Sequence, residues 1–293
     1  MELAALLDRC DFPDGLIALG VSGGADSTAM AVLARAAGRE FTIWHVDHGL
    51  RPTSSMDAAL VNALASRLDV AFELRQVSVE PGANMEARAR AARYQSLPDD
   101  VCVGHTADDR AETVLFNLLR GAGPAGVAAP MAMVKRPILR LRRAETEAVC
   151  ADAGIAPVVD EHNSDPSFTR VRVRTELLPL IADLFDRDPV PLLNRHADLV
   201  GDALEVIQDR ATHLDPTDAR ALAAAPKAIA SEALRTWLRG ELPDSTSPDA
   251  ASINRVLRVA DGTNIATEIE GGHRVSRSGG RLSLDPVDLD NQR

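Results

Sequence analysis

The sequence has 293 residues, a formal net charge of −11, 45% hydrophobic residues and 3% aromatic residues. A chain of this length has room for one full α/β domain and a smaller one, and its acidic charge excludes a uniformly basic coat for nucleic acid. Glu2 and Asp8 interrupt the first ten residues, and no uncharged apolar run approaches the ~20 residues of a membrane span. We therefore expect neither a signal peptide nor a membrane anchor.

The three cysteines, Cys10, Cys102 and Cys150, lie far apart and form no C-x-x-C pair. Neither a disulfide framework nor a zinc or iron–sulfur site is expected from them. This cysteine usage is typical of a reduced compartment, and we expect a cytoplasmic location.

A Gly-rich turn between a predicted strand and a predicted helix is the first functional signal. Residues 16–19 form a short apolar run bounded by turn residues, and residues 28–37 are rich in helix formers and end at Gly38. The turn between them, residues 21–27, reads V-S-G-G-A-D-S. This order leaves backbone N–H groups at the positive end of a helix dipole, which predicts an anion site.

The side chains of this turn suit a phosphate group. Gly23 and Gly24 let the main chain approach closely, while Ser22 and Ser27 add hydroxyl donors. The carboxylate of Asp26 is suited to holding Mg²⁺ between itself and the phosphates. The lysine of a Walker A loop and the G-x-G-x-x-G of a dinucleotide fold are both missing from this turn. An ordinary glycine turn without a ligand is the alternative interpretation.

Further strand–helix units follow the turn. Such repetition predicts an α/β fold with a doubly wound parallel sheet and right-handed crossovers. The predicted strands are residues 41–46, 70–79 and 100–105, and the predicted helices are residues 54–68, 86–97 and 107–120.

The segment that follows the fourth strand is the second functional signal. It carries His105, Asp108, Asp109 and Glu112 within eight residues. Asp109 and Glu112 are three residues apart and share a helix face, from which they are able to bind magnesium, position a hydroxyl or hold a cationic substrate. Capping of the helix N-terminus is the structural alternative for the two aspartates.

Positive charge is concentrated in the middle third of the chain. Four arginines lie between residues 136 and 143, and Arg170, Arg172 and Arg174 alternate farther on. On a helix Arg170 and Arg174 point together and Arg172 points away. Each cluster is either a nucleic-acid contact or a solvated face.

The secondary structure around these clusters is predicted as follows. Residues 121–126 are irregular, residues 135–139 and 157–160 are extended, and residues 145–153 are helical. Ser167 is predicted to cap the helix that carries the three alternating arginines.

From residue 189 the pattern changes to helices without strands. A long connecting helix is predicted over residues 192–211, with further helices from Pro226 and from residues 247 to 262. Three short strands joined by Gly-Gly turns are predicted at residues 264–269, 272–277 and 281–284. The predicted division is a catalytic domain of residues 1–186, a smaller, mainly helical domain of residues 187–286, and a polar tail of residues 287–293.

The motifs together resemble the tRNA(Ile)-lysidine synthetase family of pyrophosphate-loop (PP-loop) ATP pyrophosphatases. The similarity runs in order over roughly residues 15–182. The matching motifs are S-G-G-x-D-S at 22–27, H-V-D-H-G-L-R at 45–51, A-R-x-x-R-Y at 89–94, A-D-D-x-A-E-T at 107–113, L-L-R-G-A-G at 118–123, R-P-I-L at 136–139, D-x-x-N at 160–163 and F-T-R-V-R-V-R at 168–174.

The resemblance implies a carbon–nitrogen ligase with an adenine-nucleotide-hydrolase-like fold. ATP adenylates the C2 oxygen of the wobble cytidine in the CAU anticodon of tRNA(Ile), and free L-lysine then displaces AMP to form lysidine. The implied ligands are ATP, Mg²⁺, tRNA(Ile) and L-lysine. The resemblance leaves open whether the protein forms a homodimer. The C-terminal part resembles the first C-terminal domain of the family, without the second domain of longer members.

The resemblance also assigns roles to residues. The implied catalytic set is Asp26, Asp109, Glu112 and Arg174. The implied ATP-binding set is Ser22, Gly23, Gly24, Ala25, Asp26, Ser27, His45 and His105, with Asp26 on Mg²⁺. The arginines that match basic positions of the family are implied to contact phosphates of ATP or tRNA; they are Arg90, Arg93, Arg120 and Arg172, together with Arg174.

Two positions depart from the family pattern, Thr106 where a second histidine is common and Arg110 where glutamine is common. Two other function classes remain as alternatives. A PP-loop enzyme that thiolates tRNA usually needs catalytic or cluster-binding cysteines, which this pattern lacks. A non-catalytic ATP-binding module is disfavoured by the intact acids.

Overall fold

The computed structural model describes residues 2–47, 54–77, 88, 92, 94–128, 134–158, 165–242 and 248–286. The described residues fall into two compact units, residues 1–122 with 129–197 and residues 123–128 with 198–293. The division falls inside helix α10 (Pro189–Thr212). The predicted domain boundary between residues 186 and 187 stays a prediction, and the predicted tail lies outside the described residues.

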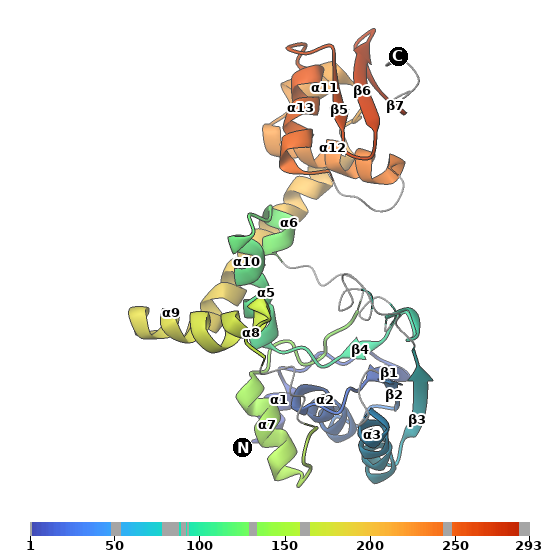
Figure 1. Ribbon diagram of the computed structural model, residues 1–293, viewed down its shortest axis with the longest axis vertical. Helices are drawn as coiled ribbons and strands as arrows, with labels where there is room; N and C mark the ends of the chain where they lie inside the picture. The colour runs from blue at the N-terminus through green and yellow to red at the C-terminus, as the bar shows by residue number, and fades with distance from the viewer. Residues whose placement is uncertain are drawn as a thin grey trace. The chain divides into compact units, whose positions relative to one another are not determined.

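A parallel sheet of four strands forms the centre of the first unit, as predicted, in the order β3-β2-β1-β4 (Figure 1). The chain moves from β1 to β2 and β3 on one side and then returns to place β4 on the other side of β1. In such a sheet the crevice outside the carboxyl ends of β1 and β4 is the usual ligand site. The strand bounds are β1 Ile17–Gly20, β2 Phe41–Asp47, β3 Ala71–Gln76 and β4 Cys102–Val103.

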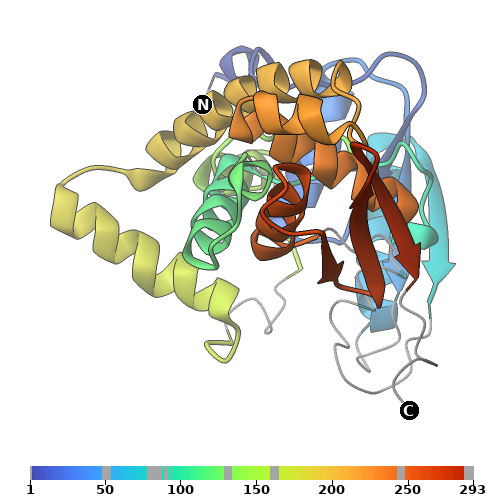
Figure 2. The same cartoon turned by 90° about the horizontal axis from the view of Figure 1, so that it is seen from above.

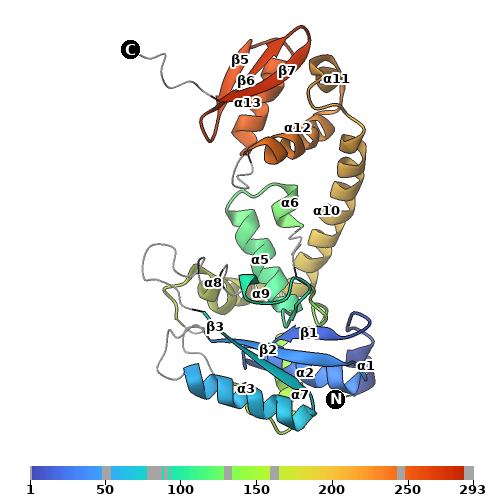
Figure 3. The ribbon, with the colours of Figure 1, turned by 90° about the vertical axis from the view of Figure 1, so that its right-hand side faces the viewer.

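Alternate residues of the central strands feed two hydrophobic clusters. Leu19 and Ile43 are fully buried in the larger cluster, while Ala18 and Trp44 pack into the other. Because successive strand residues point to opposite faces, both faces of the sheet are covered. Helices α2 (Ala25–Ala36), α3 (Ser54–Leu68) and α7 (Arg143–Asp152) lie on one face (Figure 3).

Helix α5 (Ala107–Leu119) follows β4 and packs against the segment after residue 168. That segment consists of α8 (Thr169–Arg172), the π-helical η2 (Val173–Leu177) and α9 (Leu178–Phe185). The contact buries Leu115, Val173 and Leu178. The contact joins α5 to the segment that carries Arg170, Arg172 and Arg174.

Three local predictions were wrong. Residues 135–139 form no strand, because only Lys135 bridges to Cys102 and the chain turns from Pro137 into the buried Ile138 and Leu141. Residues 121–126 were predicted to be irregular, but helix α6 (Pro124–Val127) starts at Pro124, whose fixed φ suits a first helical position. Phe168, and not Ser167, stands at the N-cap of α8.

Some predictions lie partly or wholly outside the described residues. The helix predicted at residues 86–97 is described only at residues 88, 92 and 94–97, and the extended piece at residues 157–160 only to residue 158, where no strand is formed. Helices α1 (Leu3–Leu7) and α11 (Ala219–Ala224) were not predicted.

In the second unit, three antiparallel strands in the order β5-β6-β7 pack against helices, and the three predicted strands are confirmed (Figure 2). Gly279 and Gly280, both with positive φ, form the turn between β6 and β7. Leu234, Ile253 and Val275 are fully buried or nearly so in this core. The bounds are α12 Lys227–Glu241, α13 Ala250–Ala260, β5 Ala266–Ile269, β6 His273–Ser278 and β7 Arg281–Pro286. In the part of the chain that the structure describes, no helix is both long and apolar enough to span a membrane.

Candidate functional site

The predicted strand–turn–helix is present at the carboxyl end of β1. Val21 still donates its N–H to Trp44 of β2, Gly23 turns the chain with φ +94°, and Gly24 is the N-cap of α2. The helix starts at Ala25, three residues earlier than predicted. Asp26 and Ser27 consequently lie on its first turn, at the positive end of the helix dipole.

Hydroxyl groups hold the turn together from inside. The Ser27 Oγ accepts from the Ser22 N–H at 3.2 Å, lies 3.1 Å from the Ser22 Oγ and donates to the Gly24 carbonyl at 3.1 Å. Ser27 is buried and Ser22 is exposed. Ser27 is therefore mainly a structural hydroxyl of the turn, and Ser22 is the hydroxyl that solvent or a ligand reaches.

The end of β4 touches the start of α2 through glycine. A Cβ on Gly104 would lie 2.7 Å from the Ser27 Cα and 2.8 Å from the Asp26 carbonyl oxygen. Only a residue without a side chain permits this backbone approach. The two functional stretches of the sequence are thus held side by side at the carboxyl ends of the neighbouring strands β1 and β4.

An arginine from α7 connects the acids of these two stretches. Arg143 donates from Nη2 to Asp109 at 2.7 Å and from Nη1 to Glu112 at 3.1 Å, and its Nε lies 3.5 Å from Asp26. Burial disfavours the charge of Arg143, but the three carboxylates outweigh it and raise its pKa above the usual value. We call Asp26, Asp109, Glu112, Arg143 and Arg174 the carboxylate–arginine cluster.

Glu112 is the buried centre of this cluster. Its side chain is 1% exposed, and Arg174 binds it in a bidentate manner, from Nε at 2.7 Å and from Nη2 at 3.0 Å. Arg170 on the same segment donates to Thr113, so Arg170 and Arg174 both reach α5, whereas Arg172 binds Glu176. The prediction that Arg170 and Arg174 point together and Arg172 points away is confirmed.

Asp109 fills two roles with its two oxygens. Oδ2 accepts from the Thr106 N–H at 2.8 Å and completes a capping box, while Oδ1 meets Arg143 and lies 3.8 Å from Arg174. Helix capping, the structural alternative, is therefore real but accounts for only one of the two oxygens.

The other two aspartates have opposite environments. Burial raises the pKa of Asp26, although a hydrogen bond from the Thr146 hydroxyl opposes the shift. Burial also acts on Asp108, but hydrogen bonds from the Arg142 side chain at 3.0 Å and from the Arg143 N–H at 2.9 Å outweigh it and lower the pKa of Asp108. Asp108 is thus an anchor for α7.

Both predicted histidines have defined tautomers. His45 is 5% exposed and its Nδ1 lies 2.8 Å from the Val21 carbonyl, which only accepts, so Nδ1 carries the proton. The Nδ1 of His105 instead accepts from Nε of Arg136 at 2.8 Å, so a neutral His105 carries its proton on Nε2. Both rings are fixed near the ends of the strands that precede the site.

The predicted RNA-contacting arginines have separate surroundings. Arg120 is exposed and its guanidinium lies 5.1 Å from the centre of the Phe116 ring. Arg172 is 61% exposed and paired with Glu176. Arg90 and Arg93 lie outside the described residues.

Sequence reasoning missed Arg142, Arg143 and Thr146 as site residues. The arginines were noticed only as a charge cluster, because nothing in their local pattern shows which acids they meet across the fold. Within the described ranges, no group of three or more His, Cys, Asp or Glu side chains is arranged to hold a metal ion by itself.

Comparisons with known proteins bear on the family and the fold of this chain. The PP-loop domain family matches residues 2–181. A tRNA(Ile)-lysidine synthase of Nocardia farcinica is 36% identical over 295 residues, covering 92% of this chain and 91% of that protein. One from Rhodococcus erythropolis is 41% identical over 243 residues, covering 77% and 74% of the two chains. Among solved structures, a U34-tRNA thiolase from Methanococcus maripaludis has a TM-score of 0.53 at 15% identity, covering 68% of this chain and 78% of its own, which supports the fold alone.

Proposed function

The chain belongs to the tRNA(Ile)-lysidine synthase family, and we propose that it converts the wobble cytidine of the CAU anticodon of tRNA(Ile) to lysidine. ATP activates the C2 oxygen of the cytidine and releases pyrophosphate. The amine of free L-lysine then forms a C2–N bond as the C2–O bond to AMP breaks. One observation carries this proposal: Arg143 links Asp26, on the Gly-rich turn, to Asp109 and Glu112, so the groups that we assign to the phosphates and to the lysine amine adjoin one another.

The turn supplies the groups that hold the phosphates. We assign the backbone N–H groups of Gly23, Gly24 and Ala25, at the N-terminus of α2, and the exposed Ser22 hydroxyl to the anion, while Ser27 holds the turn together through its hydrogen bonds. Preorganised donors of this kind stabilise the charge that develops on the leaving pyrophosphate. His45 on β2 and His105 just after β4, which lie on either side of β1 in the sheet, are assigned to the adenosine part of ATP.

Asp26 fits the requirements of a magnesium ligand. Its side chain remains 23% exposed at the first turn of α2, and Mg²⁺ is commonly held by one or two carboxylates together with substrate phosphates. Bound there, Mg²⁺ neutralises charge on the phosphates. The ionised form of Asp26 is the one that would bind the cation.

The two acids of α5 take different parts in lysine transfer. The Asp109 side chain is 19% exposed, so a lysine amine can reach it, whereas Glu112 is 1% exposed and engaged by two arginines. We assign Asp109 to orient the amine and accept its proton, because the attacking amine must be neutral. Glu112 positions Arg143 and Arg174, and Arg174 faces the lysine carboxylate or a phosphate. The arginines at 90, 93, 120 and 172 are assigned to RNA phosphates, since a chain with net charge −11 needs local positive charge for RNA.

The test is incubation of the protein with ATP, labelled lysine and tRNA(Ile) bearing the CAU anticodon. We expect label in the tRNA and release of AMP and pyrophosphate, and we expect Asp109→Ala and Glu112→Ala to abolish lysine transfer. Sulfur-dependent modification would favour the thiolation alternative, and nucleotide binding without turnover would favour the non-catalytic alternative. Wild-type turnover by both alanine variants would overturn the assigned roles.

A further inference from the structure

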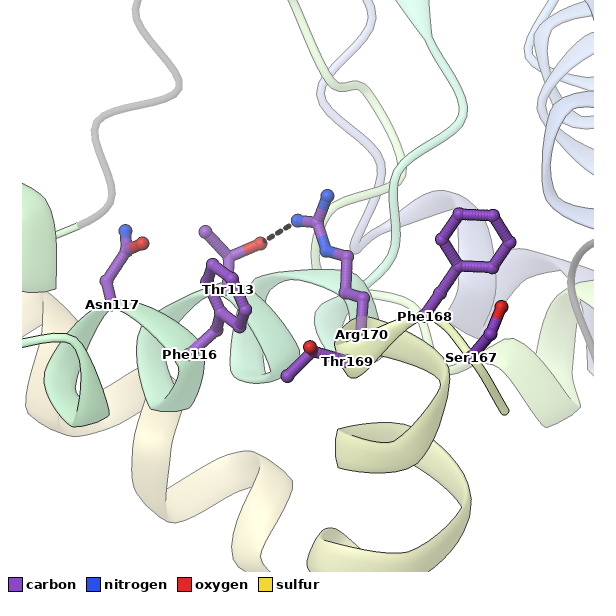
Figure 4. A pocket seen from close by; sticks show the side chains of 7 residues that line it. All are labelled: Thr113, Phe116, Asn117, Ser167, Phe168, Thr169 and Arg170. Carbon is purple, nitrogen blue, oxygen red and sulfur yellow. Dashed lines mark hydrogen bonds between the residues drawn. The ribbon is translucent and has the colours of Figure 1, made fainter. Parts of the chain in front are cut away.

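A cavity of about 480 Å³ lies beside the carboxylate–arginine cluster, between α5 and the segment around α8 (Figure 4). Its volume falls within the range of small-ligand sites. It contains none of the residues of the cluster, although Thr113 directly follows Glu112. The lining residues are Thr113, Phe116, Asn117, Ser167, Phe168, Thr169 and Arg170.

Two aromatic rings from different segments contribute to the lining. Phe116 comes from α5, and Phe168, which is 38% exposed, precedes α8. The guanidinium of Arg120 lies over the Phe116 ring. Exposed aromatic rings combined with arginines are the usual platform for an unstacked base, because every base has a π face.

The polar groups of the cavity also suit a nucleotide. Arg170 points to Thr113 and donates to its hydroxyl, as Figure 4 shows. The Asn117 amide and the Ser167 and Thr169 hydroxyls offer donors and acceptors for a base edge or a ribose. Arg170 supplies a positive charge and none of the seven described lining residues is acidic, a charge balance that suits a ligand carrying phosphate.

We propose that this cavity holds an unstacked base of the RNA substrate, from a nucleotide adjacent to the reacting cytidine. This inference rests on the proposed function. From Asp109 to Phe116 the helix α5 advances by about 10 Å at ~1.5 Å per residue, so a base stacked there lies beside the reacting centre. Holding the neighbour out of the stack helps to keep the cytidine extruded, as base-modifying enzymes require.

The first measurement is binding of a fluorescent CAU anticodon stem-loop to the full chain, without ATP or lysine. Phe168→Ala is expected to weaken binding by roughly 5- to 150-fold, which corresponds to the ~1–3 kcal/mol of one base–aromatic stack. Phe168→Tyr keeps the ring and is expected to bind within about twofold of wild type. The matched control is Phe185→Ala on α9, whose ring is 75% exposed, and it should leave binding unchanged.

The second measurement identifies the occupant. In a modified stem-loop, the nucleotide on one side of the wobble cytidine lacks its base. This RNA should bind the wild-type protein weakly, and Phe168→Ala should not weaken its binding further. A free mononucleotide has the same chemical groups as a nucleotide of the RNA and is the other possible occupant. The affinities for ATP and CMP are therefore measured with the same variants, and we expect them to equal those of the wild-type protein. Loss of mononucleotide binding, or stem-loop binding by Phe168→Ala equal to wild type, overturns the proposal.

The outcomes also separate this proposal from the proposed function. RNA binding that depends on Phe168, without lysidine formation by wild type, overturns the function and keeps the cavity as an RNA site. If the wild-type protein forms lysidine and Phe168→Ala binds RNA as tightly as wild type, the proposal for the cavity is overturned and the proposed function stands. Failure of wild type to bind the stem-loop overturns both.

Discussion

Arg143 donates from Nη1 to Oε1 of Glu112 over 3.1 Å, and this places a cation from α7 against a carboxylate of α5 that is 1% exposed. The same guanidinium meets Asp109 and Asp26, the second of which lies on the first turn of α2. One side chain therefore fixes three helices around the crevice. A buried carboxylate needs such partners, because desolvation strongly disfavours an isolated charge.

Arg143→Ala is expected to lower the free energy of unfolding by about 3 kcal/mol, near the lower end for breaking a buried ion pair, because Arg174 still partners Glu112. Lysidine formation should be lost. Arg143→Lys keeps the charge without the forked geometry and should be intermediate. Urea unfolding and lysine incorporation check this, with the exposed Arg140→Ala as control. Equal behaviour of Arg143→Ala and Arg140→Ala would contradict the central role of Arg143.

Asp26→Asn should separate stability from activity. The pKa of Asp26 is raised in the fold above its ordinary value of 3.8, so its contribution to stability is present below that value and is lost as pH rises through the folded pKa. The neutral side-chain amide of the asparagine does not lose this stability at higher pH, and its oxygen can still accept a hydrogen bond from the Thr146 hydroxyl. At pH 7 the variant is expected to unfold at the wild-type temperature or above it, yet to release no pyrophosphate from ATP. A clear loss of stability at pH 7 would show that the ionised carboxylate stabilises the fold.

Asp108→Asn should show the opposite pH dependence. The pKa of Asp108 is lowered in the fold below its ordinary value of 3.8, so its stabilising contribution is present above that value and is lost as pH falls through the folded pKa. We expect the variant to be about 2 kcal/mol less stable at neutral pH, the usual worth of hydrogen bonds to a charged group. The difference should shrink toward zero in strong acid, which urea unfolding from pH 7 downward measures. A constant difference across that range would contradict the prediction.

Gly104→Ala should disturb the Gly-rich turn from a distance in sequence. The new Cβ meets backbone atoms of Asp26 and Ser27 within 2.8 Å, and overpacking of this kind costs about 1–3 kcal/mol. ATP binding should weaken together with stability. Gly240→Ala is the matched control, because a Cβ there meets nothing within 4 Å inside α12. That control is expected to gain about 0.5–1 kcal/mol, and a Gly104→Ala variant with wild-type ATP affinity would contradict the close backbone contact.

Replacement of Cys10, Cys102 and Cys150 by alanine should leave lysine incorporation within a few-fold of wild type. Burial raises the pKa of Cys102 and of Cys150 to about 11, so both stay neutral thiols at physiological pH. In the native protein their alkylation at pH 8 should be roughly 100-fold slower than in the unfolded chain. Mass spectrometry after iodoacetamide treatment measures this rate. Loss of tRNA modification in the triple variant would favour the thiolation alternative.

Local features of the sequence determined much of this protein. The apolar run, the glycines and the helix formers around residues 16–37 lie next to one another, so the turn of β1 and α2 followed from the sequence alone. The shared face of Asp109 and Glu112 followed from their spacing, because the helical period fixes it. The motif resemblance gave the family, since many short patterns in order are far more specific than one.

Only the tertiary structure decided which charges meet. Arg143 is 31 residues from Glu112 in the sequence and reaches it from the start of α7. The sequence offers four arginines in that region, with no local sign of which acid or histidine each one meets. The structure also decided that Pro137 turns the chain toward the core where a strand was predicted. The physical reason is the same in both cases: secondary structure responds to neighbours along the chain, whereas the pairing of buried charges depends on which distant groups the fold removes from water together.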